Sequence, residues 1–388
     1  MKIHARGNID ISLSLSLFLI NLVLSASAQF QKPGWKGKVE TENGVAVVRN
    51  PEAPIYSKDV IKFEKELTIG LSEGPSEYLF GSISSYCVDD EENVYVCDDK
   101  INQISVFNNR GKYVRSIGRK GQGPGEYQII SNIQIINRNE IAIFERGKPA
   151  LIIYDKNGKI ISEKKNLSIE YSIASYIDND GNIYMGTSET FISDYIRLVK
   201  LNNKYEKIMT IAKITISSDM KHYPPNELRY ILLPDNSIAW AITSAYEISI
   251  VNSQGKLVKK ITKAYMPARI SEAFKDNMLK KTPFEFRASL KQRFGDYFPA
   301  FDIMCSDDDN WLYIKSFEKE KATDNIFIDI FDREGRYIAR NSLKMGEELT
   351  PRQEGKLVIK KNKIYVKDFN EDGFPVINRY LIKKSINS

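Results

Sequence analysis

Short apolar runs separated by polar turns dominate the chain after its first 28 residues. The run Val94–Val96 follows the turn Asp89–Asn93, and Ser105–Phe107 precedes the turn Asn108–Lys112. Asn, Asp and Gly tolerate positive φ and suit tight hairpin turns, whereas Ile, Val, Tyr and Phe suit packed, pleated surfaces. The pattern therefore predicts antiparallel strands joined by short turns.

A longer repeat runs through these strands. Ile69-Gly70 recurs 48 residues later as Ile117-Gly118, and the segment Gly74–Tyr78 recurs 49 residues later as Gly123–Tyr127. Four short strands per ~47 residues is the size of one propeller blade. The sequence therefore predicts an all-β fold, a six-bladed β-propeller, with blades at 82–118, 131–165, 171–213, 228–262, 301–343 and 356–382.

The last predicted blade shows only three strands. The missing strand is available near the other end of the chain, where Phe63–Ile69 ends in the same Ile-Gly pair that ends the first blade. We expect this N-terminal strand to complete the sixth blade and close the ring, which removes exposed sheet edges. The domains are then a leader at 1–28, an extension at 29–60 that lies along the outside, and the propeller at 61–388.

Residues 263–300 interrupt the strand pattern. Thr282–Glu285 has the form of a capping box with proline at the first helical position, and Phe286, Leu290 and Phe294 recur at helical spacing before Gly295. A similar stripe, Ile270–Met278, comes before it. We predict a helical hairpin inserted between blades four and five. It is either a lid or docking surface or a structural insertion with a solvated basic face, and its basic residues are Lys263, Arg269, Lys275, Lys280, Lys281, Arg287, Lys291 and Arg293.

The strand-and-turn motifs resemble those of a known group. Ile117–Tyr127, Asn93–Val96 and Val106-Phe107 with Gly111–Tyr113 make the chain similar to the bacterial exported six-bladed propellers related to NHL-repeat propellers. Trp35, Gly44-Val45 and Asn50-Pro51 match the usual entry segment of that family. The resemblance implies the fold over about residues 35–382 and no particular reaction. The turn Asn202–Lys204 departs from it, because it lacks the glycine.

The first 28 residues read as a signal peptide. Lys2 and Arg6 precede the apolar run Ile11–Leu24, and Ala26–Ala28 supplies small residues for cleavage. The alternative is an uncleaved anchor, but this run is shorter than the ~20 residues a membrane helix needs. We therefore expect a periplasmic or extracellular protein without a transmembrane segment after cleavage. A formal net charge of +6 is too dispersed to predict nucleic-acid binding.

Few residues suggest catalysis. His222 is the single histidine after the leader, which argues against a catalytic triad or a multi-histidine metal centre, and we interpret it as a loop residue. Acidic clusters occur at Asp89–Glu92, Asp98-Asp99 and Asp307–Asp309. They fit turn chemistry better than an EF-hand, although Ca²⁺ held in the central channel by acids of separate blades stays open. No other cofactor is predicted.

The glycine-rich segment Gly121–Glu126 lacks the ending of a phosphate-binding loop, so we interpret it as a loop between blades. Its glutamate should accept hydrogen bonds from loop amides. If the two repeated loops line the mouth of the channel, the candidate ligand-binding residues are Glu77, Tyr78, Arg119, Lys120, Glu126 and Tyr127.

Three cysteines follow the leader. Cys87 and Cys97 flank a predicted turn and would lie opposite each other on neighbouring strands, where they either form a disulfide or are two small buried residues. Cys305 has no sequence neighbour of its kind.

Two functional hypotheses result. The first is an exported, non-catalytic binding or protein-interaction propeller whose partner is a peptide, glycan or protein. The alternative is a Ca²⁺-dependent hydrolase or lyase with its site at the mouth of the central channel.

Overall fold

The computed structural model describes residues 34–56, 60–145, 150–165, 171–188, 195–215, 222–323, 325–345 and 357–385. The described residues from Trp35 onward form one compact unit. The predicted leader at 1–28 lies outside the described residues. All the strands and helices described here belong to the unit that begins at Trp35.

The first three blades are four-stranded antiparallel sheets. Blade one contains β4 (Ile83–Val88), β5 (Val94–Asp98), β6 (Gln103–Phe107) and β7 (Tyr113–Ile117). Blade two contains β10 (Ile130–Ile136), β11 (Glu140–Glu145), β12 (Ala150–Asp155) and β13 (Ile160–Lys164). Blade three contains β14 (Tyr171–Ile177), β15 (Ile183–Ser188), β16 (Tyr195–Leu201) and β17 (Lys207–Thr215).

The other three blades follow the same order. Blade four contains β18 (Leu228–Leu232), β19 (Ile238–Ile242), β20 (Glu247–Val251) and β21 (Leu257–Lys263). Blade five contains β22 (Ile303–Ser306), β23 (Leu312–Lys319), β24 (Ile326–Phe331) and β25 (Tyr337–Leu343). Blade six contains β26 (Leu357–Lys360), β27 (Lys363–Phe369), β28 (Pro375–Lys384) and the N-terminal β3 (Ile61–Ile69).

The innermost strands join the six blades into a ring. Each contacts the innermost strand of the next blade in the order β4, β10, β14, β18, β22, β26 and back to β4. The predicted blade limits agree with the observed strands to within two residues. The predicted six-bladed propeller is therefore confirmed.

A buried aspartate organises the turn between the first two strands of three blades. The Asp89 carboxylate accepts hydrogen bonds from the Glu91 and Asn93 amides and from the Tyr95 hydroxyl, at 2.8–2.9 Å. Asp178 and Asp307 repeat this arrangement with Tyr184 and Tyr313. Since all three tyrosines are fully buried, one carboxylate satisfies both the turn amides and a hydroxyl in the core between blades.

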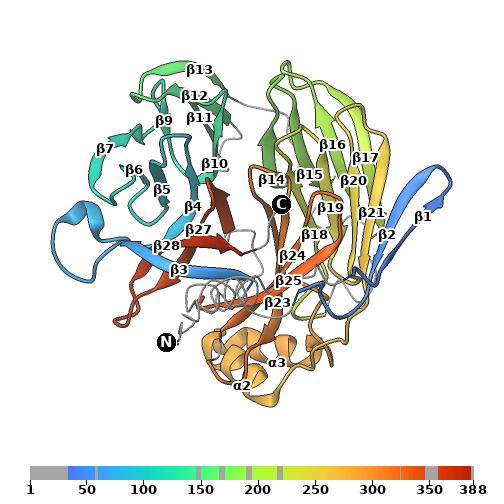
Figure 1. The fold of residues 1–388 in the computed structure, drawn as a ribbon. Helices are drawn as coiled ribbons and strands as arrows, with labels where there is room; N and C mark the ends of the chain where they lie inside the picture. The colour runs from blue at the N-terminus through green and yellow to red at the C-terminus, as the bar shows by residue number, and fades with distance from the viewer. Residues whose placement is uncertain are drawn as a thin grey trace, which may run out of the picture. The chain divides into compact units, whose positions relative to one another are not determined.

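The predicted closure by an N-terminal strand is also confirmed. β3 pairs antiparallel with β28, from Ile61 opposite Lys384 to Ile69 opposite Ile377. The Thr68 hydroxyl donates to Asn378 Oδ1 at 2.8 Å across this pair. In Figure 1 the blue strand β3 lies beside the red strands of blade six, so the two ends of the propeller share one sheet.

The N-terminal extension adds a hairpin to blade four. β1 (Lys38–Glu42) pairs antiparallel with β2 (Val45–Asn50), and β2 pairs in parallel with β21. The sheet of blade four therefore has six strands. The sequence predicted only that residues 29–60 lie along the outside.

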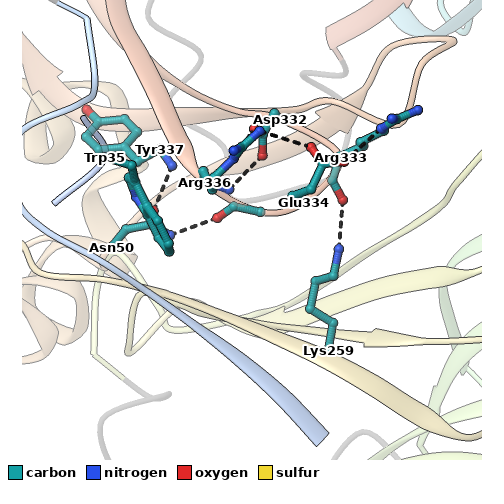
Figure 2. Close-up of polar contacts among 9 residues, drawn as sticks. Trp35, Asn50, Lys259, Asp332, Arg333, Glu334, Arg336 and Tyr337 are labelled. Carbon is teal, nitrogen blue, oxygen red and sulfur yellow. Dashed lines mark hydrogen bonds and ion pairs between the residues drawn. The ribbon is translucent and has the colours of Figure 1, made fainter. Parts of the chain in front are cut away.

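Asn50 fixes the end of this hairpin to the neighbouring blade. Its amide nitrogen donates to the carbonyls of Thr262 and Gly335, and its amide oxygen accepts from the Tyr337 amide at 2.7 Å and from Trp35 Nε1 at 3.1 Å. Figure 2 shows Asn50 between Trp35 and the turn of blade five at residues 332–336. In the same turn, the Arg333 carbonyl accepts a hydrogen bond from the Lys259 ammonium. Blades four and five are thus tied together by the hairpin that the N-terminal extension adds to blade four.

The helical hairpin is present where it was predicted, with corrections in detail. In the predicted Ile270–Met278 stripe, Ile270 precedes α2 (Glu272–Lys281) and is buried, Met278 is buried and Phe274 is half-buried. Ser271 caps the N-terminus of α2 through a bond from the Phe274 amide. α3 (Phe284–Arg293) has no side-chain cap, because the Thr282 hydroxyl donates back to the Met278 carbonyl of α2. The predicted capping box is therefore wrong, and Pro283 is the N-cap residue rather than the first helical residue.

The second predicted stripe does begin on a helix, α3, where Phe286 is 60% exposed. One further prediction about the hairpin is wrong. Lys263 is the last residue of β21, and its side chain is buried against Asp329 rather than on the basic surface of the insertion. None of the helices in the described part of the chain is long and apolar enough to cross a membrane.

Candidate functional site

A cavity of about 210 Å³ lies where the innermost strands of all six blades meet. Its walls are mainly apolar and aromatic. The contributing residues include Tyr86 and Cys87 of β4, Ile133 and Gln134 of β10, Tyr176 of β14, Arg229–Leu232 of β18, Ile303–Ser306 of β22 and Leu357–Ile359 of β26. The cavity therefore lies in the central channel, within the part that the described residues enclose.

The polar groups of these walls are already bonded to neighbouring blades. The Tyr86 hydroxyl donates to the Tyr365 carbonyl at 2.9 Å, and the Tyr230 hydroxyl accepts from the Gly186 amide at 2.6 Å. Gln134 bonds the Ile177 carbonyl and amide through both ends of its side-chain amide. These bonds fix the strands relative to each other and leave ring and aliphatic surface facing the cavity.

One group of charges adjoins the cavity, between blades four and five. Arg229 forms ion pairs with Glu227 and with Asp302, and its Nε donates to the Asp302 carbonyl at 2.7 Å. The Lys315 ammonium lies 2.7 Å from the other oxygen of Asp302. Two cations thus meet two carboxylates at the start of the strands β18 and β22.

Burial changes the proton affinity of both carboxyls. It raises the pKa of Glu227, because removal from water disfavours the ionised form more than Arg229 favours it. For Asp302 burial acts in the same direction, but Lys315 and Arg229 outweigh it and lower the pKa. Asp302 is therefore a fixed anion, while Glu227 is the carboxyl of this group that accepts a proton more readily.

The six predicted loop residues have mainly structural contacts and do not line this cavity. Tyr127 is fully buried, and its hydroxyl donates to the Ile117 carbonyl at 2.9 Å. The Tyr78 hydroxyl accepts from the Tyr113 amide, and its ring lies 5.4 Å from that of Phe107. Both tyrosines thus anchor loops between blades.

The charged members of the predicted set are spread along these loops. The Glu126 carboxylate accepts from the Gly123 amide at 2.8 Å, as the sequence predicted, and pairs with Arg119 at 2.6 Å. Arg119-Lys120 and Glu126-Tyr127 form the short parallel pair β8–β9, and Glu77 lies in the 3-10 turn Ser76–Tyr78. Gly118 begins this loop at φ +61°, where a Cβ would lie 2.5 Å from the Tyr127 ring. A role for these residues in ligand binding stays a prediction.

Cys87, Cys97 and Cys305 are buried, and no disulfide joins them. Cys87 lies opposite Tyr95 and Cys97 lies opposite Ser85, so the predicted opposition of Cys87 and Cys97 is wrong by two residues. Cys87 and Cys97 instead match the other alternative that the sequence allowed, two small buried residues. Cys87 and Cys305 both reach the cavity, from blades one and five.

The acidic residues predicted as a possible Ca²⁺ site are engaged elsewhere. Asp89 and Asp307 bind their own turns, and the Asp98 carboxylate accepts from the amides of Gly81, Ser82 and Lys100. Beside the cavity, Glu227 pairs with Arg229, and Asp302 pairs with both Arg229 and Lys315. Within the described residues no cluster of three metal-ligating side chains occurs, so this donor set does not fit Ca²⁺, which takes six to eight oxygen ligands.

The family follows from the blade sequence itself. A family model described as "6-bladed beta-propeller" (DUF5128) matches residues 69–281. The chain belongs to this family. No curated protein matches the sequence.

Solved structures share the fold of this propeller family member at low identity. One, a candidate exported protein from Bacteroides fragilis NCTC 9343, is 15% identical with a TM-score of 0.55, over 87% of this chain and 100% of the other. A DUF4221 family member from Bacteroides vulgatus ATCC 8482 is 9% identical with a TM-score of 0.56, over 84% and 99%. These likenesses concern the fold alone.

Sequence reasoning missed the residues around the cavity. Arg229 and Asp302 are 73 positions apart in the chain, and no motif connects them. The available signal was a single basic residue, Arg229, in the otherwise apolar run Leu228–Leu233. Since an innermost propeller strand is buried, a charge there indicates a partner on the next blade.

Proposed function

We propose that the protein is an exported, non-catalytic binding propeller whose site is the central cavity. One observation carries the proposal: innermost strands from all six blades contribute to one cavity, and its walls are mainly apolar. Pockets that bind small ligands or side chains are usually largely apolar, with few polar groups. Export rests on the predicted signal peptide at residues 1–28.

The walls indicate the kind of group that fits. Tyr86, Gln134 and Tyr230 direct their polar atoms to neighbouring blades, so the cavity offers chiefly aromatic and aliphatic surface. Such a surface favours an apolar or aromatic group, and a peptide side chain is the ligand we propose. Each innermost strand is also an edge of its sheet. Side chains of the next blade take some of the edge groups, as Gln134 does at Ile177, and the others would orient a peptide main chain.

A thermal-shift screen with peptides, glycans and small aromatic compounds tests the proposal. A ligand at a hundred times its Kd should raise the melting temperature by roughly 3–4 °C for a propeller of this length. The cavity-filling substitution Val358→Phe should abolish that shift. Val258→Phe, at a position of β21 that is 37% exposed and outside the cavity, is the matched control and should leave the shift intact. A shift that survives in Val358→Phe places the binding site outside the cavity.

The alternative, a Ca²⁺-dependent hydrolase or lyase, has less support. The carboxylates near the cavity are paired with Arg229 and Lys315, and those of the turns bind backbone amides. We therefore expect millimolar Ca²⁺ to leave the melting temperature unchanged. A saturable rise with Ca²⁺, absent in Asp302→Asn, would restore the alternative.

A further inference from the structure

The inserted hairpin carries a helix that the fold holds in place but does not cover. Each end of the segment is fixed by backbone bonds. The Tyr223 amide donates to the Arg293 carbonyl at 2.7 Å, and the Phe298 amide donates to the Ala268 carbonyl at 2.8 Å. α3 nevertheless has no buried residue. A helix of ten residues that buries nothing is not explained by packing of the propeller.

The two helices differ in how they contact the blades. α2 is anchored through Phe274, whose ring lies 4.9 Å from Phe298, and Phe298 stacks at 4.9 Å on Phe317 of β23. α3 lies beside α2 and shares none of these ring contacts (Figure 1). The hairpin therefore has one fixed helix and one presented helix.

Apolar side chains gather at the turn where α2 meets α3. Phe284 is 82% exposed and Phe286 is 60% exposed. Both residues lie in the first turn of α3, two positions apart, so their rings leave the start of the helix on different sides. A single exposed apolar residue is ordinary, but two phenylalanines exposed in the first turn of one helix make an apolar tip.

Basic residues surround this tip. Residues 280–293 contain five basic side chains (Lys280, Lys281, Arg287, Lys291 and Arg293) and one acidic side chain, Glu285. Lys280, Lys281 and Lys291 have no ion-pair partner among the described residues. Arg287 folds back onto the turn, where its Nε donates to the Thr282 carbonyl at 2.9 Å. Around the tip itself, Lys280, Lys281 and Arg287 outnumber Glu285 by two positive charges, and Lys291 and Arg293 add two more at the far end of α3.

We propose that this tip docks onto an anionic membrane surface, with Phe284 and Phe286 inserted and Lys280 and Lys281 at the headgroups. Charge complementarity selects an anionic partner. The exposure of both rings selects the bilayer: apolar anchors in protein interfaces lie within a ring of contacts that excludes water, whereas the neighbours here are the exposed Lys280 and Lys281. A bilayer supplies its own apolar interior and requires no matching groove. This docking is independent of the ligand proposed for the cavity.

Vesicle co-sedimentation of the exported protein, with its N-terminus verified by mass spectrometry, tests the proposal. The protein should sediment with phosphatidylcholine vesicles that contain phosphatidylglycerol and not with phosphatidylcholine alone. Lys280→Gln with Lys281→Gln should weaken binding roughly 25-fold, about fivefold for each lysine. Phe284→Ser with Phe286→Ser should abolish it. Phe369→Ser with Phe374→Ser, at 41% and 42% exposure in another loop, is the matched control and should bind as the unchanged protein does.

Because the substituted side chains are exposed, all variants should melt as the unchanged protein does, which separates loss of docking from loss of fold. Failure to sediment with the anionic vesicles would overturn the proposal. So would sedimentation that neither pair of tip substitutions reduces. Capture by polyglutamate without vesicle binding would instead assign the tip to an acidic protein and equally reject the membrane.

Discussion

The N-terminal segment joins two blades, and the two joints differ in kind. β3 enters blade six as its fourth strand and pairs antiparallel with β28. β2 lies parallel to β21 on blade four, which already has four strands of its own. The first joint completes a blade, whereas the second covers a sheet edge and reaches over to blade five through Asn50. Strands from one segment can therefore be either part of a fold or an addition to it.

Two truncations test whether the two joints differ, and they should have the largest effects on stability of the changes proposed here. A chain that begins at residue 71 lacks β3 and should lose its cooperative unfolding transition, because blade six is left with three strands and the ring stays open. A chain that begins at residue 53 lacks only β1 and β2. It should keep one transition, lowered by roughly 4–8 °C because the burial of Val47 and Val48 is lost.

Thermal melts followed by circular dichroism measure both effects. The shorter truncation keeps the bonds from the Ile55 and Tyr56 amides to blade five, so it isolates the hairpin. Cooperative melting of the chain that begins at residue 71 would show that β3 is also an addition, and the distinction between the two joints would be lost.

Asn50→Ala should sharpen the comparison by removing the second joint at a single side chain. The change leaves the buried Tyr337 amide without its acceptor and the Gly335 carbonyl without its donor. We expect a loss of about 2 kcal/mol in the free energy of unfolding, measured by urea titration. Trp35→Phe removes one bond to Asn50 and should cost less. Equal losses in the two variants would mean that the tie to blade five contributes nothing.

Lys259→Met should give the smallest effect, visible as a pH dependence. Burial lowers the pKa of Lys259 from its ordinary value of 10.5, while Glu334 and Asp332 oppose the shift in part. Between the lowered pKa and 10.5 the unfolded chain binds more protons than the folded one, so the free energy of unfolding rises with pH in that window. The methionine variant lacks this increment. The free energy of unfolding of the Lys259 protein, relative to that of the methionine variant, should therefore rise as pH approaches 10.5. A difference that stays constant with pH would contradict the assigned pKa direction.

The sequence predicted the parts of the fold that repeat. Turn residues such as Asp89 and the Ile-Gly pairs at 69 and 117 recur with blade spacing, because each blade must solve the same local problem of turning a strand and burying its end. The closing strand Phe63–Ile69 was predictable for the same reason. It ends in Ile69-Gly70, and the outermost strand of blade one ends in the same pair, Ile117-Gly118.

The parts that do not repeat could not be predicted. The parallel pairing of β2 with β21 leaves no local pattern, since Val45–Val48 would suit any sheet edge. Thr282 has the right neighbours for a capping box but bonds backward to Met278, a choice that depends on how α2 ends. The charges around the cavity, Glu227, Arg229, Asp302 and Lys315, come together only when blades four and five are side by side.

The shared sheet of blade six has a consequence for the order of events during synthesis. The bond between Thr68 and Asn378 joins positions 310 residues apart. If the chain crosses a membrane N-terminus first, β3 arrives early and must wait, without its hydrogen-bonding neighbour, until almost the entire polypeptide has followed. The pairing of β3 with β28 therefore distinguishes complete from incomplete chains. A prematurely terminated chain would leave β3 unpaired and exposed to proteases.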